Sequence, residues 1–258
     1  MSLHIFFDLV WTNEMNRAPA KSQWNFFALG LFGIAMGALE AIVVLYIRQI
    51  YYPRGFDFPL TMLSQQLLSV EWLRETATLI MLAVVGSVAG RNNLQRFAYF
   101  LYTFAVWDIS YYGWLKILLD WPSSFLTWDV LFLIPVPWIG PVLAPVIASL
   151  TMILLGGTLV MLQEKGFIAK MTLFEWSLTF LGAFIILYTF TWDYSQIIIR
   201  EYIRSGFETF GKTGHLYELI SHYEPAHYPW HFFALGEISI LCALALMYKR
   251  SWKAVRKH

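Results

Sequence analysis

The chain has 258 residues, of which 58% are hydrophobic and only 14% are charged. A soluble domain carries about 25% charged residues, so this composition indicates a membrane protein with several spans. The formal net charge of +1 leaves no basic surplus, which argues against nucleic acid as a partner. The single cysteine, Cys242, cannot form a disulfide within the chain.

Residues 1–23 come before the first long apolar stretch. They lack a positively charged start followed by a long apolar core, which a signal peptide would need. We therefore expect them to lie at the membrane surface.

Six apolar stretches then predict an all-α, polytopic membrane helix bundle that forms a single transmembrane domain over residues 1–258. The expected spans are 24–50, 72–90, 94–119, 139–162, 173–192 and 230–248.

The first span carries small residues on one face. Gly33, Gly37 and Ala41 are spaced four residues apart, which lets a neighbouring helix pack closely. Glu40 follows Gly37 by three residues and Gly33 by seven, so we expect it to point toward that neighbour rather than toward lipid.

Three carboxylates lie within the first three spans. Glu40, Glu75 and Asp108 each carry a charge that is costly in hydrocarbon and is rarely without a function there. We predict that they are the acid/base groups of one outward-facing pocket, with Arg74 or Lys116 as a nearby cation. A helix-stabilising salt bridge is the alternative interpretation of the same residues.

The segment 127–138 precedes the fourth span and cannot join it in one regular helix. Pro135, Pro137, Pro141 and Pro145 fall within eleven residues, and proline interrupts helix hydrogen bonding. We expect a broken, re-entrant piece of chain. Irregular backbone at membrane depth is tolerated only where it is buried in protein or lines a cavity.

Residues 193–229 form the largest predicted loop, beginning with an amphipathic helix. Eleven of the 18 Lys and Arg residues lie on the side of the termini, including the basic tail 249–258, and seven lie on the other side. Because cytoplasmic segments are enriched in Lys and Arg, we expect a cell-membrane protein with both termini in the cytoplasm. The loop 193–229 would then be extracytoplasmic.

Two histidines near the last span have a spacing that suits a metal. His227 and His231 are four residues apart, with Pro229 between them. Together with Asp129 they could hold zinc, copper or iron, with further ligands from His222 or the buried carboxylates. Interfacial histidines bonded to water or backbone are the alternative.

Three functions remain open from the sequence. The first is a metal-dependent membrane enzyme that acts on a lipid, quinone or isoprenoid in the carboxylate and histidine pocket. The second is a non-catalytic subunit of a larger, electron-transfer membrane complex, in which other membrane subunits and lipids are the partners. The third is a small transporter, since broken helices near buried carboxylates occur there too. The aromatic content of 18% fits either interfacial belts or stacking surfaces for a ligand.

Overall fold

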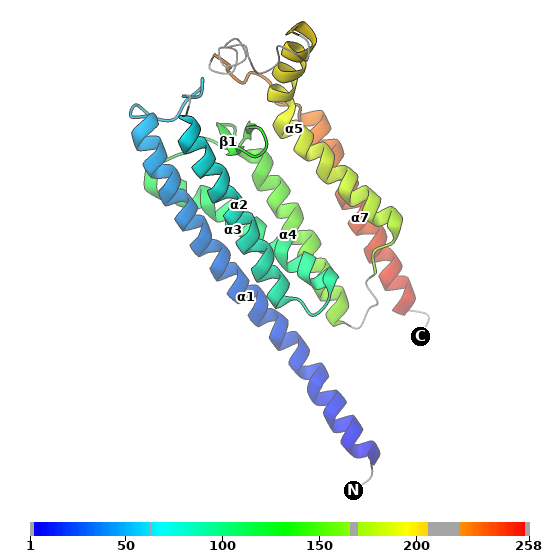
Figure 1. Ribbon diagram of the computed structural model, residues 1–258. Coiled ribbons are helices and arrows are strands. Elements are labelled where there is room, and N and C mark those ends of the chain that lie inside the picture. The colour runs from blue at the N-terminus through cyan, green and yellow to red at the C-terminus, as the bar shows by residue number, and fades with distance from the viewer. Residues whose placement is uncertain (1–2, 62, 166–169, 206–221, 256–258) are drawn as a thin grey trace.

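The computed structural model describes residues 3–61, 63–165, 170–205 and 222–255, and the side chains of all these except 3–21, 205 and 253–255. Its architecture is an all-α bundle, as predicted, with one small β-hairpin (Figure 1). The helices are α1 (Leu3–Tyr51), α2 (Gln65–Ala89), α3 (Asn93–Leu119), α4 (Leu143–Glu164), α5 (Leu173–Ser205) and α7 (Trp230–Val255). The hairpin consists of β1 (Trp128–Phe132) and β2 (Trp138–Pro141), which pair antiparallel.

Five of the described helices are long and apolar enough to cross a membrane, and α3 is the exception. The tyrosine, tryptophan and charged residues of α3 lower its mean hydropathy. This helix lies centrally, because it packs against α1, α2 and α4. Protein neighbours thus replace much of the lipid that would otherwise surround it.

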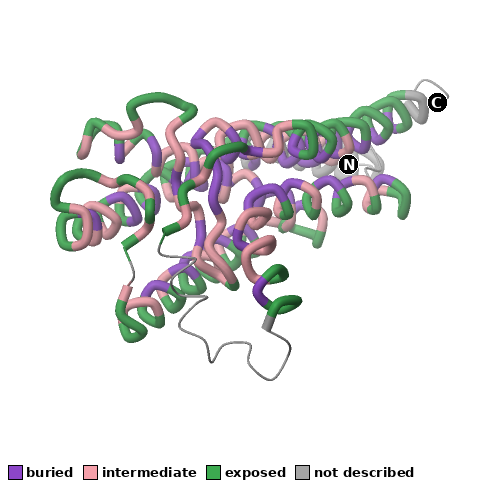
Figure 2. The backbone as a smooth tube through the Cα atoms, turned by 90° about the horizontal axis from the view of Figure 1, so that it is seen from above, coloured by how far each residue is buried: buried purple, intermediate pink, exposed green. Residues whose placement is uncertain are grey.

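The helices have exposed positions on the outside of the bundle and buried positions toward its inside (Figure 2). Many exposed side chains are large and apolar, whereas several carboxylates are buried. Val88, Leu173 and Ile203, for example, are 82%, 84% and 76% exposed, whereas Glu40 and Asp108 are 5% and 8% exposed. A soluble protein shows the reverse arrangement. The distribution is that of a membrane protein.

The small-residue face of α1 packs against α3, as predicted. A Cβ atom added at Gly37 would lie 2.9 Å from the backbone nitrogen of Tyr111, and one at Gly33 would lie 3.1 Å from that of Trp107. The Ser110 hydroxyl donates a hydrogen bond to the Gly33 carbonyl at 3.2 Å. The two backbones therefore approach closely only because these positions lack side chains.

Helices α5 and α7 form a pair beside the other four (Figure 1). They cross at two glycines, since a Cβ at Gly182 would lie 2.5 Å from the Gly236 carbonyl oxygen. This pair reaches the rest of the described bundle chiefly through β2 and α4. The other four helices, with the hairpin, hold the site described below.

Several helix boundaries differ from those expected from the sequence, and those of α1 and α5 differ most. Helix α1 is continuous from Leu3, so residues 3–23 extend the first span as helix, and their place at the membrane surface stays a prediction. Helix α5 continues to Ser205, well past the expected end at residue 192. The start of α1 and the end of α7 lie at the same end of the bundle, opposite the hairpin (Figure 1). Which side of the membrane each end faces stays a prediction.

Candidate functional site

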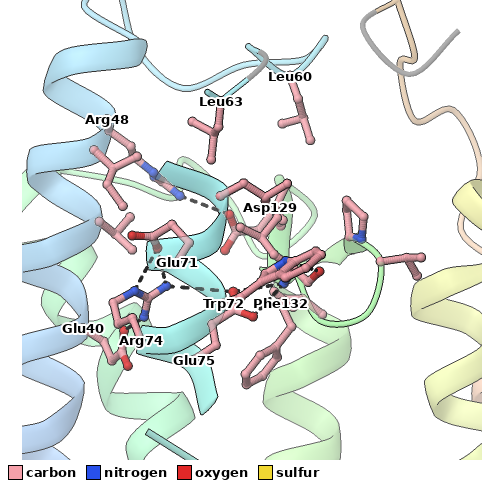
Figure 3. Close-up of a pocket in the computed structure, with 18 of the residues that line it drawn as sticks. Glu40, Arg48, Leu60, Leu63, Glu71, Trp72, Arg74, Glu75, Asp129 and Phe132 are labelled. Atoms are coloured by element: carbon pink, nitrogen blue, oxygen red, sulfur yellow. Dashed lines mark hydrogen bonds and ion pairs between the residues drawn. The ribbon is translucent and has the colours of Figure 1, made fainter. Parts of the chain in front are cut away.

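A cavity of about 650 Å³ opens at the hairpin end of the bundle (Figure 3). Helices α1, α2 and α3 and the hairpin supply most of its walls, and α5 adds Tyr194 and Ile198. Glu40 also lines it, and this residue lies eleven positions before the end of α1, about 16 Å along the helix axis. The cavity therefore reaches well into the bundle along α1.

The hairpin is the broken segment that the prolines indicated. Pro135 and Pro137 lie in its turn, where no ladder hydrogen bond needs their missing N–H groups. Pro145 lies in the first turn of α4, which tolerates proline. Residues 139–141 belong to β2, so the fourth span starts later than the expected residue 139. The pairing of two strands was not predicted.

One wall is a charged cluster around Arg74 (Figure 3). Arg74 forms ion pairs with Glu40 of α1 and with Glu71, the latter at 2.8 Å from its Nη2. Its Nη2 also lies 3.9 Å from Glu75 Oε1. The second oxygen of Glu40 accepts a hydrogen bond of 2.5 Å from Thr78. The prediction that Arg74 would accompany Glu40 is confirmed.

A second ion pair lines the cavity and joins α1 to the hairpin. Arg48 of α1 binds Asp129 of β1, with 3.0 Å between Nη2 and Oδ1. The guanidinium carbon lies 3.8 Å from the ring centre of Trp121 and 4.3 Å from that of Phe56. Burial raises the pKa of the Asp129 carboxyl, and the charge of Arg48 opposes this. The pair ties the hairpin to the first span.

Helix α2 fixes the hairpin turn through the backbone of one residue, Leu133. The Leu133 N–H donates to both oxygens of Glu75 at 3.0 Å. Trp72 donates its indole N–H to the Leu133 carbonyl at 3.2 Å. Glu75 is thus held in a defined orientation facing the cavity.

Asp108 lines the same cavity but lies apart from both ion pairs. Its Oδ2 accepts a hydrogen bond of 2.8 Å from Ser149 of α4. No Lys, Arg or His of the described chain forms a salt bridge with it. Lys116, the other expected partner, instead binds Asp120 at 2.6 Å on the surface. That part of the prediction is wrong, because Lys116 lies two turns nearer the end of α3, where the Asp120 carboxylate and backbone carbonyls meet it.

Two further carboxylates, those of Glu237 and Asp193, do not line this cavity. Glu237 accepts a hydrogen bond of 2.6 Å from Thr151, between α7 and α4. Asp193 accepts one from Tyr223.

The predicted metal ligands do not come together. His227 and His231 have exposed side chains, whereas Asp129 is 1% exposed and paired with Arg48. Within the described residues, no three His, Cys, Asp or Glu side chains form a group that could hold a metal ion. Helix α7 begins only at Trp230, so the two histidines do not share one helix face. Tyr228 between them turns inward and shares a hydrogen bond of 2.7 Å with Thr189.

Several buried polar atoms that line the cavity have no hydrogen-bond partner in the described part of the chain. They are Arg48 Nη1, Trp107 Nε1, Asp129 Oδ2 and Tyr194 Oη. Folded proteins rarely leave buried polar groups unsatisfied unless water or a ligand binds them. These atoms mark the cavity as a site for polar atoms that the chain itself does not supply.

Sequence reasoning missed several residues of this site. Arg48 lies near the end of a span, where a basic residue is ordinary, and Glu71 is one of several charges at the start of α2. Only the ion pairs with Asp129 and Arg74 distinguish them. Tyr111 also lines the cavity and was not predicted, whereas Tyr112 follows Asp108 by four residues and so lies on the same helix face.

No protein-family model, curated protein or solved structure matches the chain. The function proposed below therefore rests on the geometry of the cavity.

Proposed function

We propose that the protein is a membrane enzyme that binds a lipid-like molecule, of the lipid, quinone or isoprenoid class, in the cavity at the hairpin end. The single observation that carries this proposal is a cavity of about 650 Å³ that reaches into the bundle and whose apolar walls surround buried, unpartnered polar atoms. Small-molecule sites are typically of about 300–1,000 Å³ and combine apolar walls with a few placed polar groups. An amphiphile matches both features, because its apolar tail suits the apolar walls and its head group suits the polar groups.

The three predicted carboxylates take different roles in this proposal. Asp108 is the proton-transferring group, because Ser149 orients it and no cation of the described chain neutralises it. Glu75 faces the cavity with its orientation fixed by Leu133 and is the second acid/base candidate. Glu40 holds Arg74 in place and is a positioning residue.

The proposal needs no zinc, copper or iron, since its acid/base groups are carboxyls that already face the cavity. The hairpin end is taken as extracytoplasmic and both termini as cytoplasmic, in a cell membrane, from the distribution of Lys and Arg. Surrounding membrane lipids would supply the ligand.

The test is the identification of a bound amphiphile in protein purified into lipid nanodiscs. Organic extracts of the protein are compared by mass spectrometry with extracts of empty nanodiscs. Val44→Phe narrows the cavity wall, and Val70→Phe places the same ring on an exposed position of the neighbouring helix α2. We expect one species enriched about one to one with the parent and with Val70→Phe, and depleted from Val44→Phe. Equal recovery from all three proteins would refute the proposal.

A further inference from the structure

The charges that line the cavity do not balance. Five carboxylates face it, those of Glu40, Glu71, Glu75, Asp108 and Asp129, against two guanidinium groups, those of Arg48 and Arg74. No lysine or histidine is among the described lining residues. The lining carboxylates therefore outnumber the lining cations by three, in a region where an uncompensated charge is expensive.

The shortage is greatest around Asp108. Arg74 is already shared by three glutamates, and Arg48 is occupied by Asp129. Among the described residues, Asp108 is bonded through its side chain only to the Ser149 hydroxyl. A positive charge placed beside Asp108 would stabilise its ionised form.

The wall around this position is aromatic. Trp107, Tyr111 and Tyr112 come from the same stretch of α3 as Asp108, and Tyr194 of α5 lines the same cavity. The electron-rich faces of such rings attract cations, most strongly where water is excluded. The cavity already uses this interaction, because the Arg48 guanidinium lies over Phe56 at 4.3 Å.

Two further observations favour an organic cation. Asp129 Oδ2 and Tyr194 Oη are buried oxygens of cavity-lining residues that lack a hydrogen-bond partner in the described chain, and oxygen atoms of this kind attract a positive group. The carboxylates do not approach one another as metal ligands do, since no group of three forms among the described residues. An alkylammonium needs no such coordination shell.

We infer that the amphiphile carries an amine or quaternary ammonium group, which lies beside Asp108 among the aromatic side chains. The inference rests on the proposed function, because it names the head group of the ligand bound in that same cavity. The apolar tail of the ligand then lies along the aliphatic part of the wall, which includes Val44, Leu63 and Leu68.

The test compares three probes that share one ten-carbon chain: decyltrimethylammonium, decyl sulfate and decanol. Each is used below its micelle concentration, and its binding to protein in nanodiscs is measured with radiolabel and corrected for empty nanodiscs. The cation should bind about tenfold more tightly than the other two, as a desolvated cation–π contact beside a carboxylate permits.

Asp108→Asn keeps the shape of the side chain and removes its charge, and should weaken binding of the cation about tenfold while decanol binding stays unchanged. Glu75→Gln is the second variant and should weaken it less, because Arg74 is nearby. Asp120→Asn removes a carboxylate that is exposed and outside the cavity, and should change nothing.

The outcomes separate the two proposals. If decanol or decyl sulfate binds as tightly as the cation, the carboxyls hold their own protons and the inference is overturned, while the lipid-like site stands. If none of the probes exceeds empty nanodiscs, the proposed function itself fails. If both variants bind the cation as the parent does, the ammonium lies elsewhere and the inference is again overturned.

Discussion

Two adjacent glycines of α4 offer a direct test of how α3 and α4 hold the site together. A Cβ atom at Gly156 would lie 2.5 Å from the Ala98 carbonyl oxygen of α3, whereas one at Gly157 would meet nothing within 4 Å. Ser149, which binds Asp108, lies seven residues before Gly156 and so on the same face of α4. Substituting each glycine by alanine therefore changes one residue inside the α3–α4 contact and one outside it.

The expected magnitude follows from these distances. Carbon and carbonyl oxygen approach to about 3.3 Å, so Gly156→Ala must push α4 away from α3 by about 0.8 Å. Overpacking of this kind costs about 1–3 kcal/mol. Both variants gain the same helix propensity, at most about 1 kcal/mol, which cancels in the comparison. Gly156→Ala should therefore be about 1–3 kcal/mol less stable than Gly157→Ala.

Thermal unfolding in one detergent, followed by circular dichroism, provides the assay. At about 2–4 °C per kcal/mol for a chain of this size, Gly156→Ala should melt about 2–12 °C below Gly157→Ala. The same displacement should lengthen the hydrogen bond from Ser149 to Asp108, so Gly156→Ala should also bind decyltrimethylammonium differently from Gly157→Ala. Equal melting temperatures for the two variants would show that α3 and α4 are not in contact at Gly156.

Three further outcomes are expected. Arg48→Met should cost about 3–5 kcal/mol by leaving a buried carboxylate unpaired, and adding Asp129→Leu should restore part of it in a double-mutant cycle; purely additive losses would contradict the pairing. Trp72→Phe should cost about 0.5–1.5 kcal/mol in chemical denaturation, through one lost hydrogen bond to the hairpin; an unchanged midpoint would contradict it. In a background without the native cysteine, Lys165→Cys and Lys116→Cys should react with an impermeant reagent from opposite sides of the membrane; labelling from one side would refute the topology.

Part of the site was predictable because a charge in hydrocarbon constrains its surroundings strongly. Glu40 had to turn toward protein, and the small residues beside it showed which face was packed. Arg74 was close enough along the neighbouring span to meet it. The cost of isolating a charge, rather than any motif, made this pairing predictable.

The pairing of the hairpin strands and the placement of the two histidines could not be predicted in this way. Prolines indicate that a helix stops, but the pairing of Trp128 with Pro141 depends on tertiary contacts that no local pattern specifies. The spacing of His227 and His231 suits a metal only if one helix contains both. Helix α7 begins only after Tyr228, whose ring points inward and packs edge to face against Trp128, so the two histidines do not share a helix face.

The low mean hydropathy of α3 makes its entry into the membrane depend on its neighbours. An aspartate at the centre of an inserting helix opposes its transfer from the translocon by about 3 kcal/mol. Helix α1 is synthesised earlier, and its glycine face, including Gly33 and Gly37, fits α3. The order of synthesis therefore provides α3 with a protein partner as it leaves the ribosome. Substitutions that block this face would then lower the amount of inserted protein before they affect the stability of the finished bundle.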